Sequence, residues 1–464
     1  MQKRMNSIKN SQSIMPIAVF LVLIWLILVP LESNAQDSGP RHFSLEEAQD
    51  FAIQHSYDSR RTLLDIEAAK KKLRETLAIG LPQISSAIGY TNNLELATVL
   101  IPNFFEGKFD EKIAVQFGTQ HNANVGLTVS QLVFNGSYFV GLQTSKIYRQ
   151  LADQNHERTQ LNVLETVTNT YYLILVSEES IRILNSNLKN LEKTYFEISE
   201  LYKEGFVAET DADLVKIGVT RLKDSLQGIV RQKDIAYNLL KFQMGLNLAE
   251  ELVLSENLEN ILQRIDVQKA AENTFELSRN IDFQLLETQE KLTEMALKNE
   301  KAQYWPTVTA FYSFQWMAMR DSFNFFNFNE NWFRTQLLGF NINLPIFKSG
   351  MQKAKVAQAS IALKQAQTAK EQAAQGLKLQ ASQAKAEMDT AYDSYVNTKD
   401  NLTLSKKVYD RMLIKYKEGV SSSMDLTQAN DQFLMAQSQY IQAMSQLLTA
   451  KNKIDRLHNN YKSK

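Results

Sequence analysis

LYKEGFVAETDADL, residues 201–214, and KYKEGVSSSMDL, residues 415–426, share Tyr-Lys-Glu-Gly followed by an aspartate six residues after the glycine. The two glycines, Gly205 and Gly419, lie 214 positions apart. A four-residue match is expected about once by chance in a chain of this length, so the match is informative only if its surroundings also repeat. The flanking sequence therefore decides whether the chain contains two copies of one structural unit.

The segments before each match have the pattern of long helices. No proline occurs between Pro102 and Pro306, and none follows Pro345. Apolar residues in both tracts recur in steps of three and four, as in coiled-coil packing. The pattern predicts long helices over 137–203 and 351–417, each roughly 100 Å long at about 1.5 Å per residue.

Each match has the composition of a turn between two antiparallel helices. Gly205 and Gly419 suit the left-handed position that ends a helix. Asp211 and Asp425 then supply the short polar side chains that begin a helix. We therefore predict two helical hairpins, with return helices over 211–246 and 425–459.

In front of each long helix the apolar period changes to two, which predicts β-strands near 121–134 and 335–347. Partner strands are predicted near 82–94 and 306–319, each beginning at a proline. A second match, at an offset of 213, supports an internal two-fold repeat and pairs Gly126 with Gly339 and Phe134 with Phe347.

The N-terminus predicts export. Lys3, Arg4 and Lys9 precede an apolar run of about 16 residues, and Ser33-Asn34-Ala35 has the small-x-small pattern of a signal-peptidase site. An uncleaved anchor is the alternative, but the run is shorter than the roughly 20 residues of a membrane span. We predict a signal peptide over 1–35 and a mature chain that begins at Gln36.

Composition argues against enzymes and against nucleic-acid binding. Lys plus Arg equals Asp plus Glu at 51 each among 464 residues, so there is no basic field for nucleic acid. There is no cysteine, and no pair of the five histidines has helical ligand spacing. We predict no catalytic site, no cofactor, no metal centre and no lipid anchor on a cysteine.

The predicted fold is mixed α and β. Strands with one apolar and one uncharged polar face, in an exported protein, fit a transmembrane β-barrel. Four strands cannot close a barrel, and lipid does not tolerate open edges, so we predict a homotrimer with twelve strands, continued by a long helical coiled-coil barrel. A free-standing porin would not need the long helices. The other alternative, an exported coiled-coil scaffold with packed β-hairpins, does not account for the two strand faces.

From Phe43 to Leu457 the chain resembles TolC-type outer-membrane efflux proteins, the outer membrane factor family. The resemblance rests on FSLEEAQDFAIQHS, on the paired junctions VSQLVFNGS and INLPIFKSG, and on the doubled Y-x-x-G-x5-D pattern. It implies a channel in the outer membrane that extends into the periplasm and works with a periplasmic adaptor and an inner-membrane pump, in efflux or type I secretion. The proline usual after the first helix of each half is replaced by Ser56-Tyr57-Asp58 and by Asn280-Ile281-Asp282. The cargo cannot be read from the sequence.

The resemblance also implies roles for the hairpin ends. Asp425 matches a family position that forms an acidic ring at the periplasmic mouth, whereas a second ring position holds Gln428 and the gate arginine position holds Ser421. Tyr416 and Asp211 match gate positions, which implies a hydrogen bond between them in the closed channel. The alternative for both aspartates is simple helix capping. The resemblance implies adaptor contacts at five tip residues: Gly205, Phe206, Val207, Gly419 and Val420.

The predicted organisation of the chain follows from these elements. A first repeat, 36–246, is joined by a connector, 247–266, to a second repeat, 267–459, and a short tail, 460–464, ends the chain.

Overall fold

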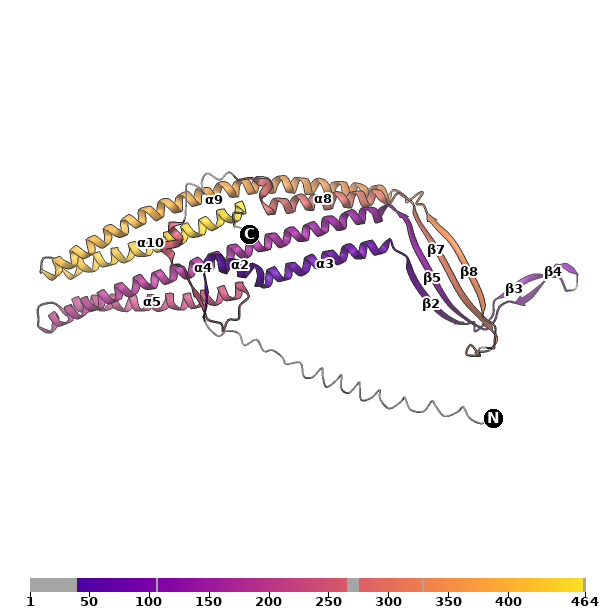
Figure 1. Cartoon of the computed structure of the whole chain (residues 1–464), viewed down its shortest axis with the longest axis horizontal. Helices are drawn as coiled ribbons and strands as arrows, with labels where there is room; N and C mark the ends of the chain where they lie inside the picture. The colour runs from indigo at the N-terminus through magenta and orange to yellow at the C-terminus, as the bar shows by residue number, and fades with distance from the viewer. Residues whose placement is uncertain (1–39, 106, 265–274, 328, 462–464) are drawn as a thin grey trace, which may run out of the picture.

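Two very long helices determine the shape of the molecule. The computed structural model describes residues 40–105, 107–264, 275–327 and 329–461. Helix α4 spans Gly136–Lys203 and helix α9 spans Met351–Lys417, where the sequence predicts 137–203 and 351–417. Both run along an elongated bundle that has helical hairpins at one end and a sheet at the other (Figure 1). The predicted signal peptide, the segment 267–274 and residues 462–464 lie outside the described residues.

The return helices begin two residues earlier than the sequence indicates. Helix α5 spans Glu209–Met244 and α10 spans Ser423–His458, each packed against its own long helix. The difference arises because Asp211 and Asp425 occupy the third helical position, and Ala208 and Ser422 are the N-cap residues. The two helical hairpins contact each other mainly through α4 and α10.

Three shorter helices extend the bundle toward the sheet. Helices α2 (Leu45–His55) and α3 (Tyr57–Ile79) are separated at Ser56, whose hydroxyl accepts from the Ser59 N–H at 3.3 Å. Helix α8 (Ile281–Ala302) is capped by Asn280, which accepts from the Asp282 and Phe283 N–H groups. Polar caps thus start α3 and α8.

The sheet has four strands in the order β2-β5-β7-β8, all antiparallel. The strands are β2 (Gln83–Asn92), β5 (His121–Asn135), β7 (Thr307–Arg320) and β8 (Phe333–Asn343). Strand β8 ends before Leu344 and Ile346, which the alternating pattern includes, and Pro345 between them cannot donate to a strand ladder. The outer edges of β2 and β8 have no partner strand among the described residues.

A second hairpin, β3 (Thr98–Asn103) and β4 (Lys108–Gln116), lies between the strands that are predicted near 82–94 and 121–134. It projects beyond the four-stranded sheet (Figure 1).

The sheet joins the two long helices differently. Strand β5 ends at Asn135 and α4 begins at Gly136, whereas β8 ends at Asn343 and α9 begins at Met351. The link between β8 and α9 includes two consecutive left-handed residues, Ser349 with φ 47° and Gly350 with φ 80°.

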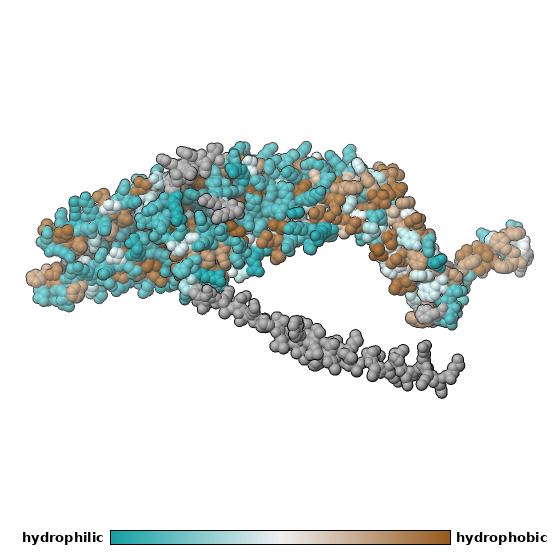
Figure 2. Space-filling model, viewed as in Figure 1, coloured by the Kyte–Doolittle hydropathy of each residue, from teal (hydrophilic) through white to brown (hydrophobic). Residues whose placement is uncertain are grey.

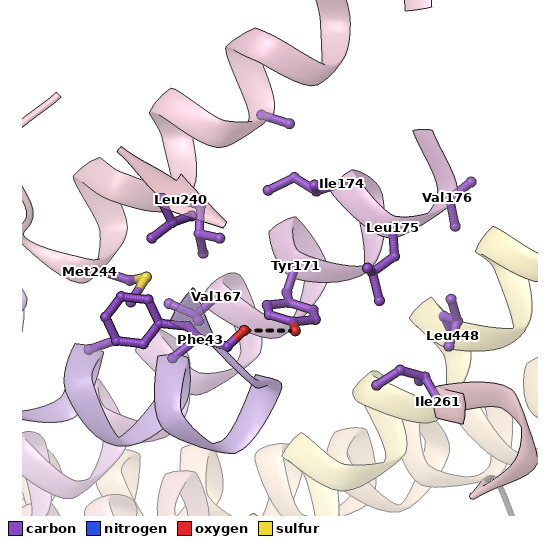
Figure 3. Close-up of a cluster of buried hydrophobic side chains, with 14 of the residues drawn as sticks. Phe43, Val167, Tyr171, Ile174, Leu175, Val176, Leu240, Met244, Ile261 and Leu448 are labelled. Carbon is purple, nitrogen blue, oxygen red and sulfur yellow. Dashed lines mark hydrogen bonds between the residues drawn. The ribbon is translucent and has the colours of Figure 1, made fainter. Parts of the chain in front are cut away.

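A buried core lies midway along the bundle. Here β1 (Arg41–Phe43) pairs in parallel with β6 (Leu252–Leu254), and the connector also forms α6 (Leu258–Gln263); η1 (Leu277–Arg279) precedes α8. Tyr171 of α4 donates its hydroxyl to the Phe43 carbonyl at 3.1 Å. Figure 3 shows this bond surrounded by side chains from both halves of the chain, including Leu240 and Leu448. The core therefore fixes the two halves to each other.

No helix in the described part of the chain combines the length and apolar character needed to cross a membrane.

Candidate functional site at the hairpin ends

The two hairpin turns have the same backbone geometry. Gly205 has φ 78° and Gly419 has φ 74°, values that favour glycine. The Phe206 N–H donates to the Leu201 carbonyl at 2.9 Å, and the Val420 N–H donates to the Lys415 carbonyl at 2.9 Å. These bonds satisfy carbonyl groups that the helix ends leave free. The repeated sequence thus encodes a repeated turn.

The turns present apolar side chains to solvent. Phe206 is 77% exposed and Val420 is 72% exposed, whereas Val207 is half-buried against the cluster between α4 and α5. The five residues expected to contact an adaptor therefore lie at the tips, with two large apolar side chains available to a partner.

Asp425 helps to cap the first turn of helix α10. Its carboxylate accepts from the Ser422 N–H at 3.1 Å and from the Ser422 hydroxyl at 2.7 Å, and the Asp425 N–H donates to the Ser422 hydroxyl at 3.1 Å. The hydrogen bonds from the Ser422 hydroxyl and backbone lower the pKa of Asp425. The carboxylate is exposed, so it keeps a charge at the tip while it caps the helix.

Asp211 joins the two tips. One oxygen accepts from the Ala208 N–H at 3.3 Å and so caps α5, and the other accepts a short hydrogen bond from the Ser423 hydroxyl of α10. Ser423 and Asp211 are 212 residues apart in sequence. This contact is the polar link between the first hairpin and the second at their ends.

Tyr416 lies between the hairpins but does not form the expected bond. Its ring packs against the clusters of both hairpins, and its hydroxyl oxygen is buried with no hydrogen-bond partner among the described residues. Burial and the nearby charge of Asp211 raise the pKa of Tyr416. The expected hydrogen bond between Tyr416 and Asp211 is thus not formed in this structure, and the hydroxyl that donates to Asp211 is that of Ser423.

The two positions at which the chain departs from the expected family pattern differ in environment. Ser421, which the resemblance matches to a gate arginine, has a buried hydroxyl without a partner in the described part of the chain. Gln428, which the resemblance matches to a second acidic ring, is exposed.

Two further contacts hold the hairpins together above the tips. Lys417 of α9 lies 3.0 Å from the Glu197 carboxylate of α4, and both side chains are more than a third exposed. Farther along, Asn187 of α4 and Gln437 of α10 exchange amide hydrogen bonds. The sequence analysis does not predict any of these three contacts between the hairpins, Asp211–Ser423 included, because contacts between distant segments leave no periodic signal. Only the serine run Ser421–Ser423 beside Asp425 could have suggested a hydroxyl donor.

In the part of the chain that the structure describes, no group of three or more His, Cys, Asp or Glu side chains could hold a metal ion.

Comparison with known proteins supports the resemblance to outer-membrane efflux proteins. Residues 276–460 match the family model described as outer membrane efflux protein. No curated protein matches the chain by sequence. Members of the matched family are transport channels rather than enzymes.

Several solved channels have the same fold. CusC has a TM-score of 0.72 at 14% identity, with 89% of this chain and 91% of that chain covered. VceC of Vibrio cholerae has a TM-score of 0.68 at 14% identity, with 89% and 95% covered. The MtrE outer membrane channel of Neisseria gonorrhoeae, solved in its open state, has a TM-score of 0.69 at 19% identity, with 89% and 88% covered.

Proposed function

We propose that this protein is a homotrimeric exit channel in the outer membrane, the last component of a tripartite efflux or type I secretion system. The family match over 276–460 and the fold shared with outer-membrane channels support this function. The trimer, the barrel and the partners are parts of the proposal.

The unpaired edges of the sheet carry the proposal. Neighbouring strands are antiparallel throughout the order β2-β5-β7-β8, so β2 and β8 run in opposite directions. The free edge of β8 in one copy can therefore pair antiparallel with the free edge of β2 in the next. Three copies give twelve strands and leave no edge exposed to lipid.

The two faces of the sheet suit such a barrel. One face carries most of the apolar residues, and one of its rows, through Ile84, Val129, Tyr312 and Leu338, is apolar on all four strands. On the other face, Thr128 and Ser313 are paired and their hydroxyls lie 3.3 Å apart. Apolar residues gather over the strands while polar residues cover most of the helical bundle (Figure 2). The apolar face would contact lipid and the polar face would line a water-filled lumen.

The helices would continue the barrel as a periplasmic tunnel. Each half of the chain contributes two strands, a long helix and a return helix, which supports an internal two-fold repeat. In the proposed topology the signal peptide over 1–35 is removed on export, and the protein is not lipid-anchored.

The hairpin ends would form the periplasmic mouth. Three copies of Asp425 would place clustered carboxylates there, and such a ring attracts cations. The exposed side chains of Phe206 and Val420 would meet a periplasmic adaptor, which connects the channel to an inner-membrane pump. The hydrogen bond between Ser423 and Asp211, together with the ring of Tyr416 packed between the hairpins, would control how far the hairpins separate.

Light scattering and conductance measurements on the purified protein test the proposal. We expect a trimer in mild detergent and discrete conductance steps after insertion into a planar bilayer. A monomer in detergent that produces no conductance would refute the channel and favour the coiled-coil scaffold.

A further inference from the structure

The four-stranded sheet carries very few charges, and both lie on one side. Among residues of β2, β5, β7 and β8, Arg320 and Arg334 are the only Lys, Arg, Asp or Glu. Arg334 is opposite Trp316, which is opposite Val125 on the next strand. Arg320 is an even number of residues from Trp316 on the same strand, so both arginines belong to the apolar face.

Both arginines also lie toward the end of the sheet remote from the helices. Eight residues separate Arg334 from Ile342 at the helix-proximal end of β8, about 26 Å at roughly 3.3 Å per residue. The lipid-facing band of an outer-membrane barrel is about 25 Å tall, and its strands tilt. If the helix-proximal end marks one membrane boundary, the arginines lie near the other, at the level of the outer headgroups.

The neighbouring side chains are those of a membrane interface. Trp316 is 43% exposed. On the same face, Tyr90 of β2 contacts His121 of β5, with 2.9 Å between the hydroxyl and Nδ1. Aromatic residues with a polar edge are enriched where lipid tails meet water.

Arg320 is enclosed but incompletely paired. Its Nη1 donates to the Asn324 carbonyl at 2.7 Å and to Asn324 Oδ1 at 3.0 Å, and its guanidinium lies 5.4 Å from the centre of the Phe325 ring. The side chain is 7% exposed, and Nη2 has no acceptor among the described residues. Because Nη2 is itself buried, Arg320 acts on an anion outside the chain through its charge rather than through a direct hydrogen bond.

We propose that the outer end of the apolar face binds the phosphate groups of anionic lipids in the outer leaflet. Arg334, which is exposed, makes the contact, and Arg320, whose Nη2 is buried, adds positive charge at the rim. Arginine presents paired donors that match phosphate oxygens, and the strand face below it supplies apolar surface for acyl chains. No acidic residue of the four strands opposes this charge. The inference rests on the proposed outer-membrane function, since it needs the apolar face to contact lipid.

Thermal unfolding of the detergent-solubilised protein, titrated with lipid, tests the proposal. Phosphatidylglycerol, which carries a negative charge, should raise Tm more than neutral phosphatidylcholine does. Arg334→Gln should increase the phosphatidylglycerol concentration that gives half of the Tm rise about tenfold, the size expected for one charge-assisted contact. Arg320→Lys, which keeps the positive charge but loses the guanidinium group, should increase this concentration less than Arg320→Gln does. The matched control is Lys378→Gln, which removes an exposed charge from α9 and should leave the titration unchanged.

Three results would overturn the proposal. One is an equal rise in Tm with both lipids, and another is an unchanged titration in both Gln variants. The third is that inorganic phosphate alone reproduces the full rise, which would indicate a free-anion site. Light scattering on the same samples separates this failure from failure of the proposed function: a trimer with no preference for anionic lipid refutes only the lipid site, whereas a monomer refutes the channel.

Discussion

Removing the Ser423 hydroxyl is expected to loosen the mouth of the proposed channel. In Ser423→Ala, Asp211 loses the donor that ties the first hairpin to the second, while its bond to the Ala208 N–H remains. Hydrogen bonds to charged groups contribute about 1.5–3 kcal/mol when well buried. Because this contact is only half-buried, we assign it about 1 kcal/mol in each subunit.

Three such losses in a trimer whose tips open together sum to about 3 kcal/mol, which changes the closed-to-open ratio roughly 140-fold. Single-channel recording in planar bilayers measures this ratio from open times. Light scattering on the same preparation checks that the trimer is intact.

Ser421→Ala provides a matched control two residues away. It removes a buried hydroxyl that has no partner among the described residues, so the closed-to-open ratio should stay the same or shift slightly toward closed. Tyr416→Phe should behave in the same way for the same reason. Equal effects of Ser423→Ala and Ser421→Ala, or a large opening by Tyr416→Phe alone, would refute the assignment of Ser423 as the tie.

Further predictions concern the tip charge and the core. Asp425→Asn should reduce cation preference in reversal-potential measurements and Gln428→Asp should increase it; an unchanged reversal potential in Asp425→Asn would leave the aspartate as a helix cap only. Because Ser422 holds the pKa of Asp425 below its usual value of 3.8, the cap is intact at neutral pH and is lost as pH falls through that lowered pKa. The Tm difference between wild type and Asp425→Asn should therefore persist at pH 5 and vanish only below the usual aspartate range. Gly245→Ala should destabilise the protein by more than about 1 kcal/mol, since φ is 75° and a Cβ would lie 2.3 Å from the His55 carbonyl oxygen. Gly228→Ala, in open space within α5, should instead increase the free energy of unfolding by about 0.5–1 kcal/mol through helix propensity, and so raise Tm.

Periodicity predicts the regular parts of this fold closely. The long helices and the strands leave repeating signals over many residues, and the proline-free tracts limit where they can run. The starts of α5 and α10 are displaced by two residues because sequence alone does not show whether an aspartate is an N-cap or lies three residues into the helix.

Contacts between distant segments are harder to predict. The partner of Asp211 depends on how two hairpins pack side by side, which no local pattern encodes, so the resemblance points to Tyr416 where the structure has Ser423. The β3–β4 hairpin is missed because the apolar residues of β3, Val99, Leu100 and Ile101, are consecutive and do not alternate with polar ones.

The different connections of the sheet to α4 and α9 have a mechanical consequence. Strand β5 passes into α4 without an intervening residue, so any rotation of α4 about its axis would twist the strand with it and strain the sheet. The segment between β8 and α9 can absorb torque, because several residues outside regular structure lie between them. In the proposed channel, α9 and α10 could therefore turn against a stationary α4 when the mouth widens, while the proposed barrel keeps its shape.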